Sequence, residues 1–217
     1  GFEAGYTDQG TGAIAMGYEA GYTGQGANSI SMGYDAGYSN QGTDAIALGN
    51  NAGKIEQKEE AIAIGKNSGF QFQNNNAIAI GENAGFQYQK SNAIAIGEDA
   101  GFQNQHSNTV AIGFEAGYID QGENAIALGY KAGRVQQLNN TIIINAHQNE
   151  LNSSNTGAFY INPIRNELSD TVLTYNPTTK EITYSTGPVG PTGANGDAGA
   201  DGADGAKGDT GDAGADG

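Results

Sequence analysis

The chain has 217 residues, of which 36 are glycine, four are proline and none is cysteine or tryptophan, and its formal net charge is −15. This acidic balance argues against nucleic-acid binding and against electrostatic docking on anionic lipid, because both need clustered Lys and Arg. The absence of cysteine excludes a disulfide scaffold and a thiolate metal site. No apolar run approaches the about 20 residues of a membrane-spanning helix. We therefore expect no nucleic-acid partner, no membrane insertion and no single deep core.

A sixteen-residue unit fills the first two thirds of the chain. In residues 113–128 it reads GFEAGYIDQGENAIAL, and it recurs nine times from residue 1 to residue 144 without insertion or deletion. A short period repeated without slippage predicts a solenoid, in which each coil packs only against its neighbours. At about 4.8 Å per coil, nine coils would form a rod of roughly 43 Å.

Each unit ends with a run such as Ala77-Ile78-Ala79-Ile80, in which small and large apolar residues alternate. Alternation with period two predicts a strand whose two faces differ. We expect the large residues to fill the inside of each coil and the alanine face to pack against other copies around a threefold axis. The predicted core column consists of Ile14, Ile30, Ile46, Ile62, Ile78, Ile94, Val110, Ile126 and Ile142.

Two glycines four residues apart open each unit, such as Gly1 and Gly5 in the first and Gly113 and Gly117 in the eighth. They suit corners that need positive φ or a close approach between coils. In the incomplete tenth copy Asn145 and Asn149 replace them, and asparagine is the side chain that best tolerates positive φ. We therefore predict turns at all of these positions.

A glutamine also recurs in every unit and is expected to form a ladder of side-chain amides between coils. Its members are Gln9, Gln25, Gln41, Gln57, Gln73, Gln89, Gln105, Gln121 and Gln137. Three residues before it, an aromatic column is interrupted by Lys54 and Arg134; its members are Tyr6, Tyr22, Tyr38, Phe70, Phe86, Phe102 and Tyr118. Packing explains this column better than glycan stacking, because aromatic rings bury large areas.

The recurring pattern N-[AS]-I-[AS]-[IML]-G-x-x-A-G, which begins at Asn124 in one copy, resembles the head repeat of trimeric autotransporter adhesins (the YadA-like head). The resemblance covers about two thirds of the chain. It implies a left-handed parallel β-roll, with three rolls packed side by side around a threefold axis. The sixteen-residue coil is longer than the coil usual in that family.

After residue 149 the period stops, so the solenoid head is assigned to residues 1–149 and a β connector to residues 150–186. Strands are predicted at Thr171 to Tyr175 and Glu181 to Ser185, joined by a turn at residues 176–180 that contains Pro177. The segment YINPIRN…LTYNPTTKEITY, together with such head repeats, resembles the sequences of fibre proteins of large DNA viruses and tailed phages. In those proteins this segment often precedes a self-cleaving carboxy-terminal chaperone domain.

From Gly187 to Gly217 every third residue is glycine. Only glycine fits the crowded axis of a collagen triple helix, so ten unbroken triplets predict three intertwined chains roughly 90 Å long. A flexible linker has no reason to keep a period of three. The solenoid and the tail therefore both predict a homotrimer.

Few residues suggest chemistry. Ser169, Asp170, Lys180, His106 and His147 are of catalytic types, but nothing in the sequence places a histidine beside the serine. Acidic and amide residues in the turns could bind Ca²⁺, but acidic residues do not recur at one fixed position. We therefore predict no catalytic site, no metal site and no cofactor.

These observations predict an all-β protein: a parallel β-solenoid in a homotrimer, then a short β connector and a collagen triple helix. We expect a non-enzymatic, extracellular fibre, on a virion or phage surface, that contacts a host glycan or protein. A bacterial surface adhesin or filament subunit is one alternative, and a fibre-borne glycan-degrading or self-cleaving enzyme precursor is another. The chain begins in phase with the repeat and ends on a Gly-X-Y glycine, so we expect it to be part of a longer protein.

Overall fold

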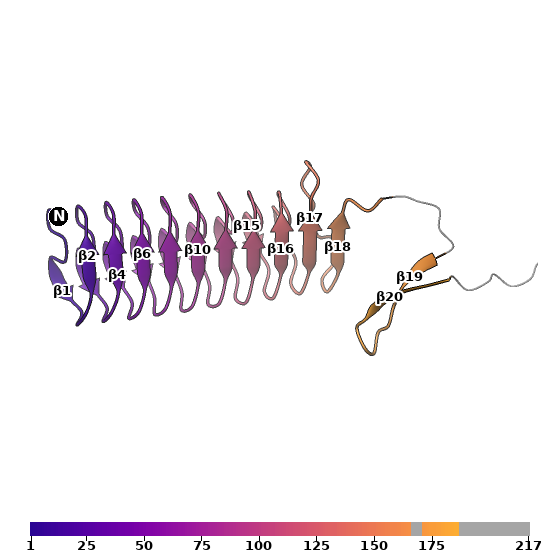
Figure 1. Ribbon diagram of the computed structural model, residues 1–217, viewed down its shortest axis with the longest axis horizontal. Helices are drawn as coiled ribbons and strands as arrows, with labels where there is room; N and C mark the ends of the chain where they lie inside the picture. Colours follow the sequence, from indigo (N-terminus) through magenta and orange to yellow (C-terminus); the bar gives the residue numbers. More distant parts are fainter. Residues whose placement is uncertain (166–170, 187–217) are drawn as a thin grey trace, which may run out of the picture. The chain divides into compact units, whose positions relative to one another are not determined.

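The computed structural model describes residues 1–165 and 171–186. The chain divides into a unit of residues 1–165 and a second unit that begins at residue 166. The first unit is a regular parallel β-solenoid (Figure 1). Within the described ranges, no helix has the length and apolar character needed to cross a membrane.

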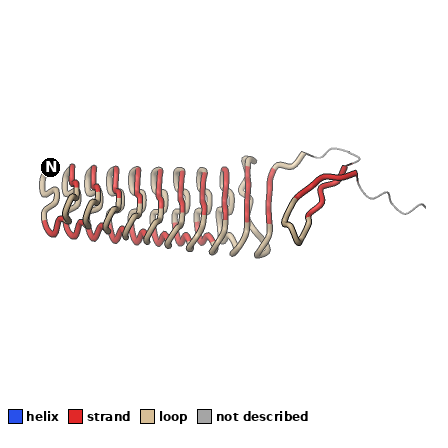
Figure 2. The backbone as a smooth tube through the Cα atoms, turned by 60° about the horizontal axis from the view of Figure 1, so that its bottom comes forward, coloured by secondary structure: helices blue, strands red, loops and turns tan. Residues whose placement is uncertain are grey.

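The solenoid carries two parallel sheets, on two sides of its coils (Figure 2). The eight-stranded sheet contains β1 (Thr7–Gln9), β3 (Thr23–Gln25), β5 (Ser39–Gln41), β7 (Ile55–Gln57), β9 (Gln71–Gln73), β11 (Gln87–Gln89), β13 (Gln103–Gln105) and β15 (Ile119–Gln121). The ten-stranded sheet contains β2 (Ile14–Met16), β4 (Ile30–Met32), β6 (Ile46–Leu48), β8 (Ile62–Ile64), β10 (Ile78–Ile80), β12 (Ile94–Ile96), β14 (Val110–Ile112), β16 (Ile126–Gly129), β17 (Ile142–Asn145) and β18 (Phe159–Asn162). Neighbouring coils pair in register, for example Ile78 with Ile94 and Ala79 with Ala95.

The inside of each coil is lined by small residues, which reverses the predicted orientation of the strands. Ala79 and its equivalents from Ser31 to Ala127 in the ten-stranded sheet are fully buried, and Ala15 in the first coil is partly exposed. The isoleucine column predicted to form the core points outward: Ile14 is 46% exposed, Ile142 is 40% exposed, and the members between them are partly exposed. The core assignment of these nine residues was therefore wrong.

The glutamine side chains explain why only small residues fit inside. In the fourth coil, the Gln57 amide crosses the interior and donates to the main-chain oxygen of Ile46, at 2.9 Å. A Cβ atom added to Gly53 would lie 2.7 Å from Gln57 Oε1 and 3.2 Å from the Cβ of Ala47. With the amide in place, the space opposite it holds an alanine or a glycine but no isoleucine.

The corners of the coil are built from residues in the left-handed region. The predicted turn glycines Gly5, Gly113 and Gly117 have φ of 62°, 126° and 55°. Gly1 allows a close approach instead, because a Cβ there would collide with the main chain of Gly17. These assignments are confirmed.

Three further positions of each coil, the third, eighth and twelfth, also adopt positive φ. Their non-glycine residues have φ between 49° and 59°, as at Asn83, Tyr88 and Asn92 of one coil. Most of these residues are Asn, Asp or Glu, and short polar side chains tolerate the left-handed region best. The Asn, Asp and Glu residues that the sequence places in turns therefore have a backbone role there, because they adopt the left-handed conformation.

The solenoid extends beyond its predicted end at residue 149. β18 pairs in parallel with β17, with Ile142 opposite Phe159, and the compact unit ends at Arg165. Neither Asn145, which lies in β17, nor Asn149, which lies in the bend after it, adopts positive φ, so these asparagines do not take the left-handed conformation expected of them. The side-chain amide of Asn145 stabilises this end of the solenoid instead, because it donates to the main-chain oxygens of Tyr130 and Asn149, both at 2.7 Å.

The described part of the second unit is an antiparallel pair, β19 (Thr171–Tyr175) and β20 (Ile182–Thr186). The Asn176 side chain accepts main-chain hydrogen bonds from Thr178 and Thr179 in the connecting turn. The predicted hairpin is confirmed, with its second strand one residue later than expected. The predicted collagen-like segment, residues 187–217, lies outside the described residues.

Candidate functional site

The largest candidate surface is the outward side of the ten-stranded sheet, here called the aliphatic face. It consists of the isoleucine column from Ile14 to Ile142 and a second column, from Met16 to Ile144, two residues further along each strand. All eighteen residues are Ile, Val, Leu or Met. Phe159 and Ile161 of β18, 50% and 41% exposed, continue the two columns by one more coil.

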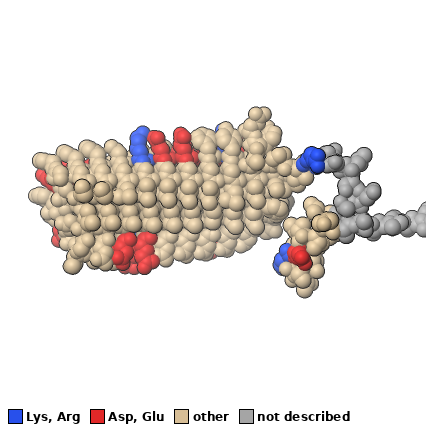
Figure 3. All heavy atoms as spheres, viewed as in Figure 1, with Lys and Arg blue, Asp and Glu red and all other residues tan. Residues whose placement is uncertain are grey.

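No charged residue interrupts these columns. Viewed from the side of the ten-stranded sheet, the acidic and basic side chains gather towards the edges of the solenoid and leave a broad uncharged band along its length (Figure 3). A continuous apolar surface of this extent is rare on monomeric proteins, and it is typical of an interface.

The predicted glutamine ladder runs inside the coils. From Gln41 to Gln137, each Nε2 up to Gln121 donates to the Oε1 of the next glutamine, at 3.0–3.2 Å. Each amide also donates to a main-chain oxygen of the ten-stranded sheet; in Gln89 the acceptor is Ile78, at 2.8 Å. The buried amides are thereby hydrogen-bonded, and the ladder prediction is confirmed for these seven coils.

The ladder ends differently at its two extremities. In the first coils Gln9 and Gln25 bond only to main-chain oxygens, and the Ser31 hydroxyl donates to Gln41 Oε1 in place of a glutamine. At the other end the Nε2 of Gln137 donates to the Thr141 hydroxyl, at 3.1 Å. Thr141 thus supplies the acceptor that the next coil would have provided.

Shorter polar ladders lie on the outside at the turn positions. Asn51, Asn67, Asn83 and Asp99 form one, in which each amide donates to the next residue sixteen positions on. Another links Asn92, Asn108, Asn124 and Asn140. Both connect neighbouring coils through side chains, in addition to the main-chain pairing.

The predicted aromatic column is a stack of rings in the structure. Tyr6, Tyr22 and Tyr38 stack at 5.0–5.2 Å between centroids, and Phe70, Phe86, Phe102 and Tyr118 stack at 4.9 Å. Lys54 fills the gap, with its Nζ 5.7 Å from the ring centroids of both Tyr38 and Phe70. The column is therefore continuous in its contacts, as expected for packing.

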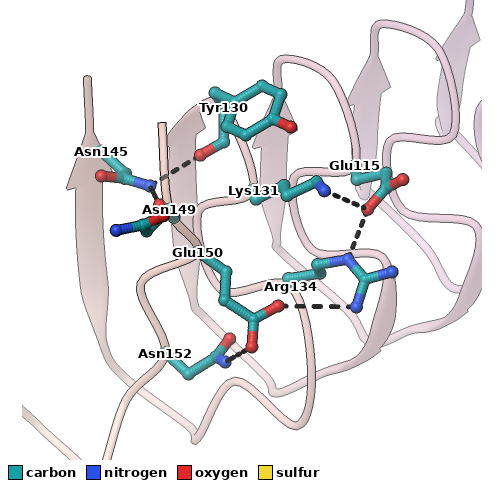
Figure 4. Close-up of polar contacts among 8 residues, drawn as sticks. All are labelled: Glu115, Tyr130, Lys131, Arg134, Asn145, Asn149, Glu150 and Asn152. Atoms are coloured by element: carbon teal, nitrogen blue, oxygen red, sulfur yellow. Dashed lines mark hydrogen bonds and ion pairs between the residues drawn. The ribbon is translucent and has the colours of Figure 1, made fainter. Parts of the chain in front are cut away.

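The last coils of the solenoid are tied together by charged side chains (Figure 4). Glu115 accepts from Arg134 and pairs with Lys131, and Arg134 also pairs with Glu150. The hydrogen bond to Glu115 raises the pKa of Arg134. Glu150 in turn accepts from the Asn152 amide, at 3.4 Å.

Sequence reasoning missed several further aromatic stacks: Phe2, Tyr18 and Tyr34 form one, Phe114 and Tyr130 form another, and a third lies on the eight-stranded sheet. Phe72 and Tyr88 stack at 5.1 Å, and each is 41% exposed. The next residue in that column is Asn104, whose Nδ2 donates to Asp120 Oδ1 at 2.7 Å. A hollow of about 260 Å³ opens here, lined by Tyr88, Lys90, Asn104, Gln105, His106 and Asp120.

The residues of catalytic type are not brought together where the structure describes them. His106 is exposed in the turn before β14, and His147 lies in the cap, where its Nδ1 accepts from the main chain of Asn149. Lys180 lies in the turn of the hairpin, in the other unit. Ser169 and Asp170 lie outside the described residues, and within the described ranges no three His, Asp or Glu side chains are grouped as metal ligands.

Comparisons with known proteins give no assignment: no family model, no curated protein and no solved structure matches this chain.

Proposed function

We propose that this protein is a structural, homotrimeric extracellular fibre, in which three solenoids pack through their aliphatic faces. The observation that carries the proposal is the aliphatic face itself: two uninterrupted columns of Ile, Val, Leu and Met on the outside of the coils. Burying such a surface against an identical one is favoured by about 25 cal/mol for each Å² removed from water. A rotation axis parallel to the solenoid brings equivalent columns of all chains together along their full length.

The collagen-like sequence of the tail supports three copies rather than two. The Gly-X-Y period of residues 187–217 is the pattern of chains that associate in threes. It is independent of the solenoid, since it follows a different period in a different segment. A surface role for the fibre rests on the resemblance to adhesin heads and viral fibres, and the host glycan or protein contact belongs to that role.

The first experiment is the molar mass of the purified chain by light scattering, together with circular dichroism on warming. A mass near three chains, with a polyproline-type signal that melts separately from the β signal, is expected. A monomer at micromolar concentration, without such a signal, would overturn the trimeric fibre.

A variant locates the interface. Ile78→Glu combined with Ile94→Glu places two carboxylates per chain in the aliphatic face, where burial of unpaired charge is costly. The expected result is a shift of mass from three chains towards one, with the β signal retained. The matched control is Gln71→Glu combined with Gln87→Glu, which adds the same charge to the eight-stranded sheet. Equal mass and melting temperature in both double variants would exclude this face as the interface.

A further inference from the structure

The hollow beside Tyr88 has the composition of a small-molecule site. Phe72 covers one face of the Tyr88 ring, so the other face is turned towards the coil of Asn104, where the column holds a short side chain. One apolar wall and a few convergent polar groups are the usual make-up of a ligand pocket. No other coil offers this combination, because the eighth position is aromatic only at Phe72 and Tyr88.

The polar groups of the hollow are arranged on the side away from the ring. Asn104 donates to one oxygen of Asp120, which leaves the Asn104 carbonyl oxygen and the second Asp120 oxygen as acceptors. A ring that carries hydroxyl groups on its edge and C–H groups on its face would donate to these acceptors while its face lies on Tyr88. That is the chemistry of a sugar.

Lys90 gives the hollow a free positive charge. Of the lysines in residues 1–165, Lys54, Lys58, Lys66 and Lys131 each take part in an ion pair, and Lys90 takes part in none. The chain has a net charge of −15, but this ammonium group has no carboxylate partner. It can therefore form a charge-assisted hydrogen bond with an anionic group on the ligand.

We propose that the hollow between Tyr88 and Asp120 binds an acidic saccharide, with the sugar ring on Tyr88, its hydroxyl groups on Asn104 and Asp120, and its carboxylate on Lys90. The site is shallow and exposed, so a single copy binds weakly, and three copies on one fibre raise the affinity for a surface that carries many such sugars. The hollow lies on the eight-stranded sheet, away from the aliphatic face. The proposal deepens the surface-contact role proposed above, but the site itself needs only one chain.

The experiment is saturation-transfer NMR titration of the full chain with sodium glucuronate, and with glucose and sodium acetate as the neutral-sugar and simple-anion probes. Glucuronate is expected to bind most tightly, glucose several times more weakly, and acetate not detectably. Binding of acetate equal to that of glucuronate, or no glucuronate binding at about 10 mM, a concentration that would reveal even millimolar affinity, would overturn the proposal.

Two variants with matched controls assign the contacts. Tyr88→Asn removes the ring but keeps a residue that suits φ of 57°. It is expected to weaken glucuronate binding about tenfold, and Phe72→Asn is its control.

Lys90→Gln is expected to reduce the preference for glucuronate over glucose about fivefold. Its control is Lys58→Gln, at the same position two coils earlier, which leaves this preference unchanged. If the two test variants bind as their controls do, the site is wrong. Light scattering on the same samples shows separately whether the chain is trimeric, so failure of the sugar site and failure of the fibre are distinguishable.

Discussion

At the scale of single residues, the buried glutamine determines what else a coil can contain. Its amide spans the interior and donates both to the next glutamine and to the opposite sheet, as Gln89 does to Gln105 and Ile78. Buried amides are stable only when they are hydrogen-bonded, and a connected network is worth more than its separate bonds. The alanines opposite are therefore a consequence of the glutamines, and the large aliphatic residues are left on the outside.

Replacing Gln89 by leucine tests this account. The substitution keeps the volume but removes the amide hydrogen bonds to the main-chain oxygens of Ile78 and Ala93, and it leaves the facing amide atoms of two neighbouring glutamines without partners. We expect a loss of about 3 kcal/mol in the free energy of unfolding, measured by chemical denaturation at a fixed protein concentration. Gln87→Leu, in the same strand but facing outward and half-buried, should cost under about 1 kcal/mol. Similar losses in the two variants would contradict the role assigned to the ladder.

The sequence predicted the coil and its ladders but not the direction in which the strands face. Period, register and the glutamine column follow from spacing alone, since residues sixteen apart must stack. Whether Ile78 or Ala79 points inward does not follow from alternation, because both faces are apolar. Which residue points inward depends on the width of the coil. That width is set by the length of the Gln73 side chain and its equivalents, which cross the interior to bond the opposite sheet.

At the scale of structural elements, the end of the solenoid differs from its repeating part. In β17, Ile143 occupies the position that holds alanine or serine in the preceding coils, and it is fully buried, with Leu151 and Tyr160 packed against the same cluster. Hydrogen bonds from Ser154, and then from Asn155, lower the pKa of Tyr160 and fix its hydroxyl at the rim. These larger side chains thus cover the end of the solenoid interior, which the alanines of the repeating coils would leave exposed to solvent.

Ile143→Ala restores the residue type of the repeat but removes this closure. We expect the cavity to cost about 3 kcal/mol and the last two coils to open first, because terminal repeats have only one neighbour. Hydrogen exchange should show lost protection at residues 126–145 before the central coils change. Ile119→Ala, on the outward face of β15, is the control; uniform loss of protection along the solenoid would contradict a local cap.

The connector showed the limits of sequence reasoning in a different way. The hairpin of β19 and β20 was predicted because Asn176 and Pro177 form a recognisable turn between β-rich stretches. β18 was missed because it is preceded by a longer loop than the repeat allows: its residue Phe159 pairs with Ile142, seventeen positions earlier. A search for a sixteen-residue period does not detect a strand that follows the preceding one after seventeen residues.

At the scale of the whole molecule, charge opposes the proposed assembly. Each chain carries a net charge of −15, so three chains side by side repel one another, and the aliphatic face must overcome this repulsion. Dissolved salt screens such repulsion over distances of about 10 Å at 0.1 M.

We therefore expect the melting temperature of the assembled fibre to rise by several degrees when salt is increased from about 20 mM to about 200 mM. Circular dichroism on warming, at constant chain concentration, measures the effect. The Ile78→Glu, Ile94→Glu variant serves as the dissociated control and should respond less. A melting temperature that falls with salt would show that attraction between charges, and not the aliphatic face, holds the chains together.

The shared register of the ladders also restricts how the length of this rod can change. Removing residues 81–96 would join Ile80 to Gly97, and Gln73 would then meet Gln105, so every column would close again one coil shorter. Removing one residue fewer would leave a coil of seventeen residues at the junction, whose extra residue a loop would have to absorb, as the loop before β18 does. The rod therefore changes length with all of its ladders intact in whole coils of sixteen residues, about 4.8 Å at a time, so duplication or loss of one repeat in the gene alters its length in fixed steps.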